Sequence, residues 1–458
     1  MRTPVIAIFD IGKTNKKLFL IDECYKILWE ETVQLVETTD EDGFACEDIE
    51  ELTRWVKSSI HGLFEGREFE IKAINFSTYG ASLVNLNKAG KIITPLYNYL
   101  KPYPDHLQKE FYDKYDTNGD FSVNTASPKL GSLNSGLQLY RLKNEQPEIF
   151  RQIHYSLHLP QYLNYLITKQ VYADITSIGC HTALWDFTLN EYHKWSQKEN
   201  ISVKLPRLFS SENVLRVTYN SQNILVGVGL HDSSAALIPY LTAFDEPFIL
   251  ISTGTWCISL NPFNKTPLTI KELEEDCLCY MEYQGKPVKA SRLFAGNEHE
   301  QQTKRLAEHF GVEPDFYKTV EFDTDIIKTV RLESSKTTDN KETSEIIADS
   351  GFVTRDLNHY KSYAIAYHQL IMDIIEKQVY STTLIIQDTS IKMMFVDGGF
   401  SKNPIYMHLL AEAFPDIEIY ASKVAQATAI GAAQSIHKFW NTKQVSKNII
   451  ALKKIIRL

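Results

Sequence analysis

Four short segments of the chain carry residue types that can hold a phosphate or accept a proton. The first is Asp10-Ile11-Gly12-Lys13-Thr14-Asn15, in which a carboxylate precedes a turn with backbone N–H, hydroxyl, amide and ammonium groups. Such a turn suits an anionic phosphate, and a carboxylate at a strand end suits Mg²⁺. A P-loop is excluded because the G-x-x-x-x-G-K-[ST] spacing is absent, and an ordinary hairpin turn is the alternative.

The second and third segments are built around glycine. Ser252-Thr253-Gly254-Thr255 places small hydroxyl residues around one glycine, so the backbone can approach a phosphate closely. Val396-Asp397-Gly398-Gly399-Phe400-Ser401-Lys402-Asn403 pairs two glycines after an apolar run, which suits a flat ligand or a sharp turn from strand to helix. A plain glycine turn explains each segment equally well when it is considered alone.

The fourth segment, Gly229-Leu230-His231-Asp232-Ser233-Ser234, places a carboxylate between an apolar run and small residues. Asp232 either caps a helix or accepts a proton from an attacking hydroxyl group. His231 beside it is expected to pack or to contact a substrate. His299-Glu300 begins like a zinc-protease motif, but position 303 is Thr and the motif fails.

Composition excludes several classes of protein. The 458 residues are enough for two or three domains, and a net charge of −9 argues against general binding to nucleic acid or anionic membranes. No apolar run reaches the roughly 18 residues of a membrane helix, and the short run 5–9 does not resemble a secretory signal. Six scattered cysteines predict free, buried thiols, with Cys277 and Cys279 on one face of a strand. We therefore expect a cytoplasmic location.

Hydrophobic patterns place the motifs on a series of strands and helices. Strands are expected at 5–9, 18–22, 71–77, 224–230, 248–252, 256–260 and 392–397, and helices at 47–64, within 128–170, at 235–241, at 360–379 and from about Pro404. The strand–turn–strand unit at 5–22 returns at 248–260, about half a chain later. This repetition fits a duplicated architecture and fits chance equally well.

Two further segments carry expectations. The stretch 330–350 is the most polar in the chain and is expected to be an exposed insertion or loop. The last ten residues, 449–458, fit a basic amphipathic helix that packs on its own domain.

The order of the four segments resembles the FGGY family of carbohydrate kinases. An Asp-x-Gly turn opens the chain, an Asp lies near the middle, Thr-Gly-Thr follows about twenty residues later, and Gly-Gly lies near the end. The resemblance runs from Asp10 to about Ala433 and implies an α/β fold of two actin-like (ribonuclease H-like) domains with ATP in the cleft between them. Leu159–Thr168 and Ser252–Trp256 look most like the rhamnulokinase and fuculokinase branch.

The resemblance implies roles for individual residues. Asp232 would be the general base, and Asp10 the carboxylate associated with Mg²⁺. The residues that would bind ATP are Gly12, Lys13, Thr14, Asn15, Thr253, Gly254, Thr255, Gly398, Gly399 and Asn403, with 427–433 as the helix behind the adenosine. The candidates for the sugar pocket, which should be polar and aromatic, are Thr78, Tyr79, Gly80, Asn98 and His231.

The chain departs from the family pattern at several positions. Lys13, Asn15 and Lys17 replace the usual Thr, Ser and Arg of the first loop. The substrate stretch, often Trp-x-Asp-x-Arg, is here Tyr97-Asn98-Tyr99, and Phe400 replaces a third glycine. These changes affect the identity of the sugar more than the chemistry.

The resemblance predicts ATP-dependent phosphorylation of a small ketose such as rhamnulose, fuculose or xylulose. Residues 1–242 would form a sugar-binding domain with the first phosphate loop, 243–440 a nucleotide-binding domain, and 441–458 a tail. The partners would be a small sugar, with neither nucleic acid nor membrane, and a homodimer is left open. The alternatives are a non-catalytic pseudokinase of the same fold and an actin-like chaperone or filament ATPase.

Overall fold

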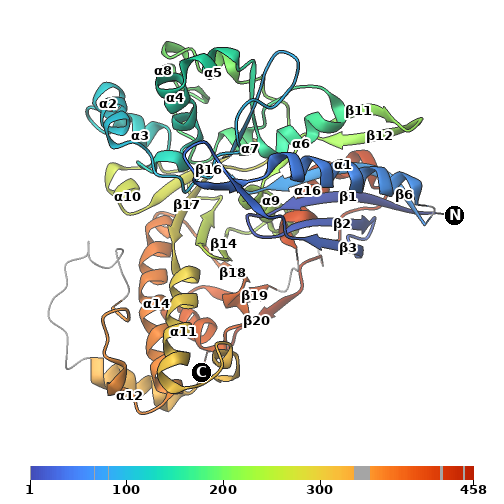
Figure 1. Ribbon diagram of the computed structural model, residues 1–458. Helices are drawn as coiled ribbons and strands as arrows, with labels where there is room; N and C mark the ends of the chain where they lie inside the picture. The colour runs from blue at the N-terminus through green and yellow to red at the C-terminus, as the bar shows by residue number, and fades with distance from the viewer. Residues whose placement is uncertain are drawn as a thin grey trace.

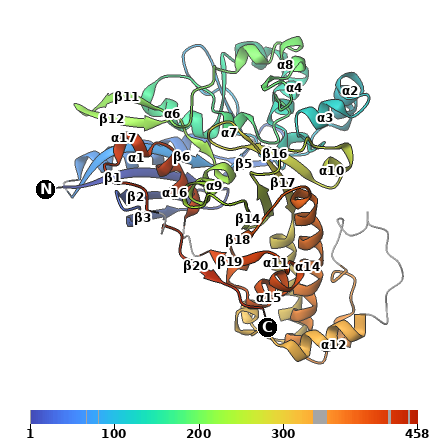
Figure 2. The ribbon, with the colours of Figure 1, turned by 180° about the vertical axis from the view of Figure 1, so that it is seen from behind.

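The computed structural model describes residues 2–66, 68–80, 82–334, 351–422, 426–446 and 449–457. Two seven-stranded sheets organise them, one in each half of the chain. Figure 1 shows the first half above and the second half below, and Figure 2 shows the same division from behind. The predicted α/β class is confirmed. The predicted domain boundaries at 242 and 440 stay predictions.

The first sheet has the strand order β11-β12-β6-β1-β2-β3, and β13 also pairs with β6. The predicted opening hairpin is confirmed, because β1 and β2 pair antiparallel, whereas β6 runs parallel to β1. The strands are β1 (Thr3–Ile11), β2 (Lys16–Asp22), β3 (Ile27–Val33), β6 (Phe69–Thr78), β11 (Val214–Tyr219), β12 (Gln222–Gly227) and β13 (Leu230–His231).

Helices cover both faces of this sheet. In α1 (Ile49–Glu65), the residues Leu52, Val56 and Ile60 recur every fourth position and are buried against the sheet. The Asp48 side chain accepts hydrogen bonds from the first free N–H groups of this helix. The strand core of β1 is apolar throughout, as expected when both faces of a strand are covered.

The second sheet has the order β16-β17-β15-β14-β18-β19-β20 and repeats the centre of the first. An antiparallel hairpin, β14–β15, is followed by a parallel neighbour, β18, as β1–β2 is followed by β6. The strands are β14 (Phe248–Thr253), β15 (Cys257–Asn261), β16 (Cys277–Met281), β17 (Pro287–Leu293), β18 (Met393–Gly398), β19 (Glu418–Ser422) and β20 (Leu452–Lys454).

The end of the chain differs from the sequence prediction. The helix expected over 449–458 is wrong, because residues 452–454 form β20 and pair antiparallel with β19. The edge of β19 offers free backbone N–H and C=O groups, and pairing with them satisfies the backbone of residues 452–454. A short isolated helix is only marginally stable, so the strand is favoured. Most of the polar stretch 330–350 lies outside the described residues; its first part ends α12 (Thr324–Ser334).

Long helices cover the second sheet on the side away from the first half of the chain (Figure 1). Tyr363 begins α14, the longest helix, where Ser362 caps it, and its apolar side chains pack into a core with α15 and the sheet. The helices are α10 (Ile270–Glu274), α11 (Ala295–Phe310), α14 (Tyr363–Ile386) and α15 (Pro404–Ala413).

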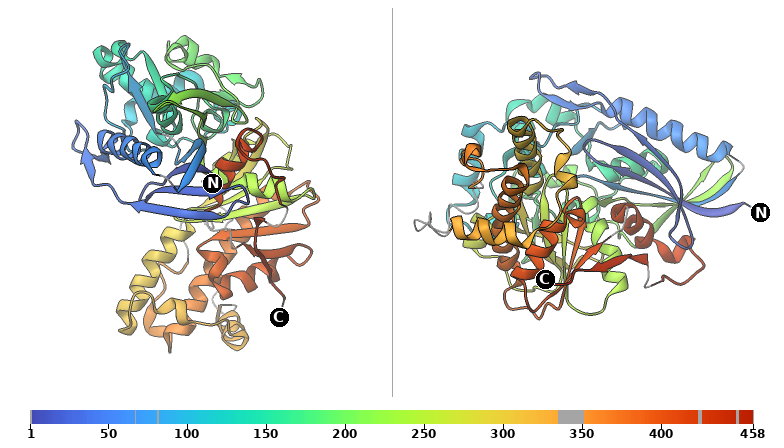
Figure 3. Two further views of the ribbon diagram at one scale, coloured as in Figure 1. Left: turned by 90° about the vertical axis from the view of Figure 1, so that its right-hand side faces the viewer. Right: turned by 90° about the horizontal axis from the view of Figure 1, so that it is seen from below.

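Two helices join the halves. α9 (Asp232–Ala243) and α16 (Ala427–Ser435) cross so closely that a Cβ atom on Gly431 would lie 1.8 Å from the Ala235 carbonyl oxygen. The left view of Figure 3 shows the red helices α16 and α17 (His437–Trp440) beside the blue strands of the first half. The crossing therefore fixes the second half against the first sheet.

The remaining elements build an additional layer on the first half. They are β4 (Glu37–Thr39), β5 (Ala45–Glu47), β7 (Leu83–Leu86), α2 (Asp105–Tyr115), α3 (Asp120–Asn124), α4 (Ser135–Glu145), α5 (Pro147–Gln152), β8 (Tyr155–His158), α6 (Leu159–Thr168), α7 (Ile175–Ile178), β9 (Trp185–Asp186), β10 (Glu191–Tyr192) and α8 (Lys194–Lys198). The hairpin β4–β5 reaches back to the turn between β1 and β2, as described below.

All six cysteines are free thiols. Five are buried as predicted, and Cys277 and Cys279 lie on one face of β16. Cys24 is exposed, contrary to the prediction. In the described part of the chain, no helix combines the length and apolar character needed to cross a bilayer.

Candidate active site

The carboxyl ends of β1, β6 and β13 meet at one edge of the first sheet. In the register of these strands, Asp10 lies opposite Ser77, and Thr78 lies opposite both Ile11 and His231. Parallel strands present their following loops at a common edge. The predicted phosphate loop at 10–15, the predicted sugar residues at 78–80 and the predicted base with its neighbour at 231–232 are thereby brought together although they are far apart in the sequence.

Asp10 lies deep at this edge and contacts the second half of the chain. Its Oδ2 accepts a hydrogen bond of 2.8 Å from the hydroxyl group of Thr428 at the start of α16. Burial raises the pKa of Asp10 to about 6, and the negative charge of Asp232 contributes to that increase. Two carboxylates that repel each other in this way offer the oxygen ligands that Mg²⁺ prefers, so the residues present fit a divalent cation.

The first predicted phosphate loop is a tight turn. The backbone N–H of Gly12 donates to the Asn15 carbonyl at 2.9 Å, and the Lys16 ammonium donates to the carbonyls of Gly12 and Lys13. Lys13 extends from the turn and forms an ion pair with Glu37 of β4 at 2.5 Å. The Lys16 ammonium thus stabilises the backbone of the loop, and the Lys13 ammonium is paired with the Glu37 carboxylate.

Asp232 begins α9 and keeps about a third of its side chain exposed, 36%. The backbone N–H of Ser233 donates to its Oδ1 at 2.6 Å and fixes the carboxylate. The His231 Nδ1 lies 3.6 Å from the same oxygen, and burial lowers the pKa of His231, which keeps the ring neutral. The His231 ring stacks on Tyr280 with centroids 5.6 Å apart.

The five predicted sugar residues divide into two groups. Gly80 lies against His231, since a Cβ atom on Gly80 would be 2.3 Å from the imidazole Nε2, and this pair lies next to Asp232. Three others use their polar groups inside the protein. Thr78 donates to the Tyr79 carbonyl, the Tyr79 hydroxyl donates to Glu47, and the Asn98 amide donates to the Ala45 carbonyl.

Tyr99 is a neighbour of Asp232 that sequence reasoning did not select. Burial raises the pKa of Tyr99, and the charge of Asp232 adds to the increase, so the two side chains lie within electrostatic range. Its ring packs beside Tyr79 with centroids 6.0 Å apart. The signal in the sequence is the aromatic spacing of residues 97–99, of which the sequence analysis selects only Asn98.

The second loop and the paired glycines form one unit at the end of the second sheet. The N–H of Gly399 donates to the Thr253 carbonyl at 3.0 Å, and the N–H of Phe400 donates to the Thr253 hydroxyl at 3.0 Å. Gly398 has φ of +84°, and a Cβ atom there would lie 1.8 Å from the Thr253 carbonyl oxygen. Only glycine therefore permits this contact between β14 and β18.

A cavity of about 560 Å³ opens beside this unit and is lined by the two loops and by aromatic rings. The Tyr367 hydroxyl is the polar centre, because the Asn403 amide donates to it at 2.8 Å and His299 Nε2 lies 2.9 Å away. Burial lowers the pKa of His299 to about 4, so the imidazole is neutral at pH 7.

Gly296, His299 and Tyr367 are among the residues of this cavity that sequence reasoning missed. A Cβ atom on Gly296 would lie 1.8 Å from the Gly254 carbonyl oxygen, so α11 begins directly against the second loop. His299 attracted attention only as part of a failed zinc motif. The available signal was a glycine between an apolar strand and a long amphipathic helix, which is typical of a close approach between backbones.

A glycine-containing loop thus heads each of two similar sheets, a carboxylate stands at the first loop, and a second carboxylate begins the helix that joins the halves. This arrangement is that of the actin-like fold class. Residues 5–238 match the FGGY family of carbohydrate kinases, N-terminal domain, and residues 245–331 match the carbohydrate kinase FGGY, C-terminal domain. The chain belongs to the FGGY family of carbohydrate kinases.

Two curated relatives are rhamnulokinases. The chain is 24% identical over 263 residues to rhamnulokinase of Halalkalibacterium halodurans, a match that spans 54% of each chain. It is 23% identical over 420 residues to rhamnulokinase of Oceanobacillus iheyensis, covering 86% of this chain and 83% of that one. The first match therefore spans only about half the length of its relative.

Solved structures show the same fold over nearly the whole chain. A carbohydrate kinase from Novosphingobium aromaticivorans is 20% identical with a TM-score of 0.81, covering 100% of this chain and 95% of that one. Plasmodium falciparum glycerol kinase with ADP is 19% identical with a TM-score of 0.76, covering 96% and 90%. The predicted fold of two actin-like domains is confirmed.

Proposed function

We propose that this carbohydrate kinase transfers the γ-phosphoryl group of ATP to a hydroxyl group of a small ketose, such as rhamnulose, fuculose or xylulose. The observation that carries the proposal is the placement of Asp10 and Asp232 at one sheet edge, close enough for the charge of Asp232 to raise the pKa of Asp10. The rhamnulokinase relatives support the choice of a ketose.

Asp232 is assigned to orient the sugar hydroxyl and to accept its proton as the bond between oxygen and phosphorus forms. Phosphoryl transfer passes through a loose transition state, so positioning and charge neutralisation matter more than a strong base. The hydrogen bond from the Ser233 N–H fixes Asp232 at the start of α9 while a third of the side chain stays accessible. Gly80, His231 and Tyr99 are assigned to the wall around the sugar.

Asp10 is the residue that would hold Mg²⁺, which supplies neutralisation of phosphate charge. The Thr428 hydroxyl occupies one oxygen of Asp10 and so orients the carboxylate across the junction of the two halves. The N–H groups of the Gly12–Asn15 turn and of the Thr253–Thr255 loop are assigned to the phosphates.

The cavity beside Gly399 is assigned to the adenosine part of the nucleotide. Its rings include Tyr317, Tyr367 and Phe400, and flat rings around a mostly apolar space suit a purine. The His299–Tyr367–Asn403 hydrogen bonds hold these rings in place. The structural likeness to a glycerol kinase with ADP supports this assignment.

The test is sugar-dependent ADP release with Mg²⁺-ATP against a panel of rhamnulose, fuculose, xylulose, ribulose, fructose, glycerol and gluconate. We expect one ketose to stimulate release strongly and Asp232→Asn to lower turnover by about 10² to 10⁴-fold with ATP binding retained. The matched control is Asp113→Asn, an exposed aspartate on α2 paired with Lys109, which should leave turnover unchanged.

Other outcomes would redirect the assignment. ATP binding without release on any sugar would favour a pseudokinase, and ATP hydrolysis without a sugar would favour an actin-like ATPase. Full turnover in Asp232→Asn would remove that residue from the mechanism. A cytoplasmic location and a homodimer remain predictions for fractionation and for size-exclusion chromatography with light scattering.

A further inference from the structure

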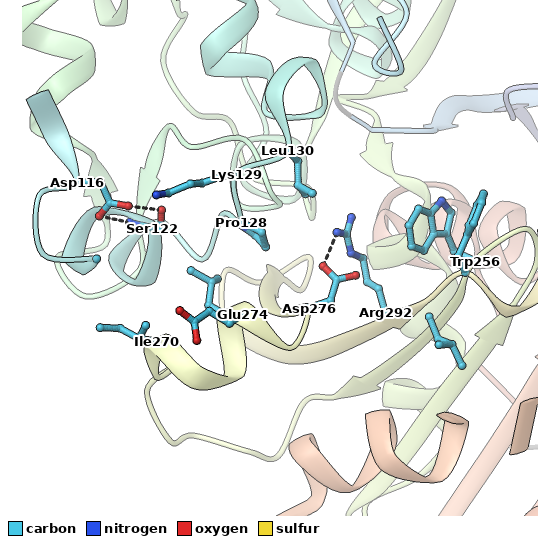
Figure 4. Close-up of a pocket in the computed structure, with 14 residues that line it drawn as sticks. Asp116, Ser122, Pro128, Lys129, Leu130, Trp256, Ile270, Glu274, Asp276 and Arg292 are labelled. Carbon is cyan, nitrogen blue, oxygen red and sulfur yellow. Dashed lines mark hydrogen bonds and ion pairs between the residues drawn. The ribbon is translucent and has the colours of Figure 1, made fainter. Parts of the chain in front are cut away.

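A second cavity, of about 660 Å³, is lined by residues of both halves of the chain and shares no lining residue with the cavity beside Gly399. From the first half it is lined by the segment between Asp116 and Leu130, and from the second by α10, by Trp256 and by the end of β17. Figure 4 shows Arg292 in this cavity, with its guanidinium group between the Asp276 carboxylate and Trp256.

Arg292 is a buried cation, and the described residues use only part of its hydrogen-bonding capacity. Its Nη2 donates to Asp276 Oδ1 at 2.6 Å, and its guanidinium carbon lies 5.0 Å from the centre of the Trp256 ring. Its Nε–H is buried and has no hydrogen-bond acceptor among the residues that the structure describes. A buried N–H without an acceptor costs free energy, and a hydrogen bond to a ligand oxygen would recover that cost.

The register of the second sheet places Arg292 on the face of β17 that leads toward Asp232, the proposed general base. On β17, Val288, Ala290 and Arg292 share one face, and Tyr280 lies opposite Val288 on β16. This face packs against α9, whose first residue is Asp232. Arg292 therefore lies at the end of the face that leads back to the catalytic carboxylate.

Side chains between Asp232 and Arg292 form a continuous wall. His231 stacks on Tyr280, and His181 meets both rings edge-on with centroids 6.4 and 6.1 Å away. Burial lowers the pKa of His181 to about 3, and the positive charge of Arg292 lowers it further, as expected for near neighbours. The wall consists of neutral rings with an aspartate at one end and an arginine at the other.

We infer that Arg292, which is held by Asp276, contacts the end of the sugar remote from the phosphorylated hydroxyl. This contact favours binding of an uncharged sugar over a sugar acid. The inference rests on the proposed function and narrows its substrate class. The open Nε–H supplies one hydrogen bond to a hydroxyl or carbonyl oxygen, and the Trp256 ring supplies an apolar surface for C–H groups.

Charge balance explains the exclusion of a sugar acid. Asp276 already neutralises Arg292, and Asp10 and Asp232 stand at the other end of the wall. The cavity itself is lined by Asp116, Glu274 and Asp276 against Arg292 and Lys129, three negative charges against two positive ones, so a carboxylate on the sugar would be repelled. A hydroxyl group has no such penalty, because it needs only the open donor.

The first experiment measures sugar binding directly, by calorimetry with rhamnulose, fuculose, xylulose and gluconate in the presence of Mg²⁺-ADP. We expect Arg292→Met to raise the Kd of the preferred ketose by about 10 to 100-fold with the Kd of ADP unchanged. The matched control is Arg355→Met, which removes an arginine bound to Asp373 in the same half but away from the cavity. It should leave both constants unchanged.

The second variant, Asp276→Asn, keeps the shape and frees the charge of Arg292. We expect it to raise the affinity for gluconate relative to the ketose by about tenfold or more. An unchanged ratio, or ketose binding by Arg292→Met equal to that of the wild type, would overturn the inference. Failure of the proposed function has a different signature, namely full turnover in Asp232→Asn while these binding constants behave as expected. Absence of ketose binding by the wild type would overturn both.

Discussion

The Lys16 ammonium lies 2.7 Å from the Glu47 carboxylate, and both side chains are almost fully buried, with 2% and 4% exposed. Lys16 also donates to the carbonyls of the first phosphate loop, and Glu47 accepts the Tyr79 hydroxyl at 2.5 Å. The pair thus connects the loop that precedes Lys16 with the β4–β5 hairpin. Through Tyr79 it is also connected with Tyr99, one of the residues assigned to surround the sugar.

Removing one partner of this pair should be far more costly than removing both. Lys16→Met leaves the Glu47 charge buried without a cation, with only the Tyr79 hydroxyl bound to it, which we expect to lower the free energy of unfolding by about 3 to 5 kcal/mol. Lys16→Met/Glu47→Leu removes both charges and should recover most of that loss. Urea denaturation measures each value.

The control for this prediction is an exposed pair of the same residue types. Lys72 and Glu70 also lie 2.7 Å apart, but their side chains are 41% and 52% exposed. Lys72→Met should cost about 1 kcal/mol or less, because water screens the charges. A double variant no more stable than Lys16→Met would show that the effect of Lys16 does not come from the unpaired charge of Glu47.

Asp10 should give the metal-free protein a specific dependence on pH. Burial raises its pKa from 3.8 to about 6, so the folded state holds the proton more tightly than the unfolded chain. Its contribution to stability is therefore full below pH 3.8 and is lost as the pH rises through 6. Asp10→Asn should be more stable than the wild type by roughly 2 to 3 kcal/mol above pH 6, and equally stable near pH 4.

Thermal unfolding in EDTA across pH 4 to 8 measures this difference. With Mg²⁺ and ATP present the order should reverse, because only the wild type retains the carboxylate assigned to the metal. A difference that grows toward low pH would contradict the prediction and would mean that Asp10 is stabilised as a carboxylate.

Residues at the end of an apolar strand, where small or polar residues follow, could be predicted from the sequence, whereas residues without such a junction beside them could not. Asp10, Gly12, Thr253 and Asp232 stand where an apolar strand meets small or polar residues, and such a junction is visible in the sequence. The order of these junctions along the chain resembles that of the FGGY family, and this resemblance predicts the fold, which the two similar sheets and the solved structures confirm.

Arg292, His299 and Tyr99 lie on a strand, on a helix and in an irregular stretch, with neighbours that give no chemical signal. Arg292 becomes informative only through sheet register, which places it on the face that packs against α9. Conversely, Asn98 and Thr78 have suitable side chains, but the folded backbone uses their hydrogen-bonding groups. Composition cannot reveal which polar groups the fold satisfies internally.

The helix crossing should tolerate no side chain at Gly431. A Cβ atom there would lie 1.8 Å from the Ala235 carbonyl oxygen, so Gly431→Ala must push α16 away from α9. Since α9 begins at Asp232 and α16 carries Thr428, which binds Asp10, both stability and turnover should fall. We expect a loss of about 2 to 4 kcal/mol, measured by denaturation, and a parallel loss of turnover.

Gly62 provides the matched control for this substitution. It lies within α1, is exposed, and has open space around its missing Cβ atom. Gly62→Ala should stabilise the protein by about 0.5 to 1 kcal/mol through helix propensity alone. If Gly431→Ala behaved like Gly62→Ala, the two halves would not depend on close contact at the crossing.

The ion pair between Lys13 and Glu37 should compete with the nucleotide. Lys13 replaces the usual threonine of the family loop, and its ammonium lies 2.5 Å from the Glu37 carboxylate at the surface. In the proposed site Lys13 exchanges this carboxylate for a phosphate of ATP, so Glu37→Gln should lower the KM for ATP by about two to fivefold, and Lys13→Met should raise it. The KM for the sugar should not change in either variant.

Because both partners are partly exposed, the advantage of Glu37→Gln should shrink as the salt concentration rises from 0.05 to 0.5 M. An unchanged KM for ATP in both variants would place Lys13 outside the phosphate site and leave the turn held by backbone N–H groups alone.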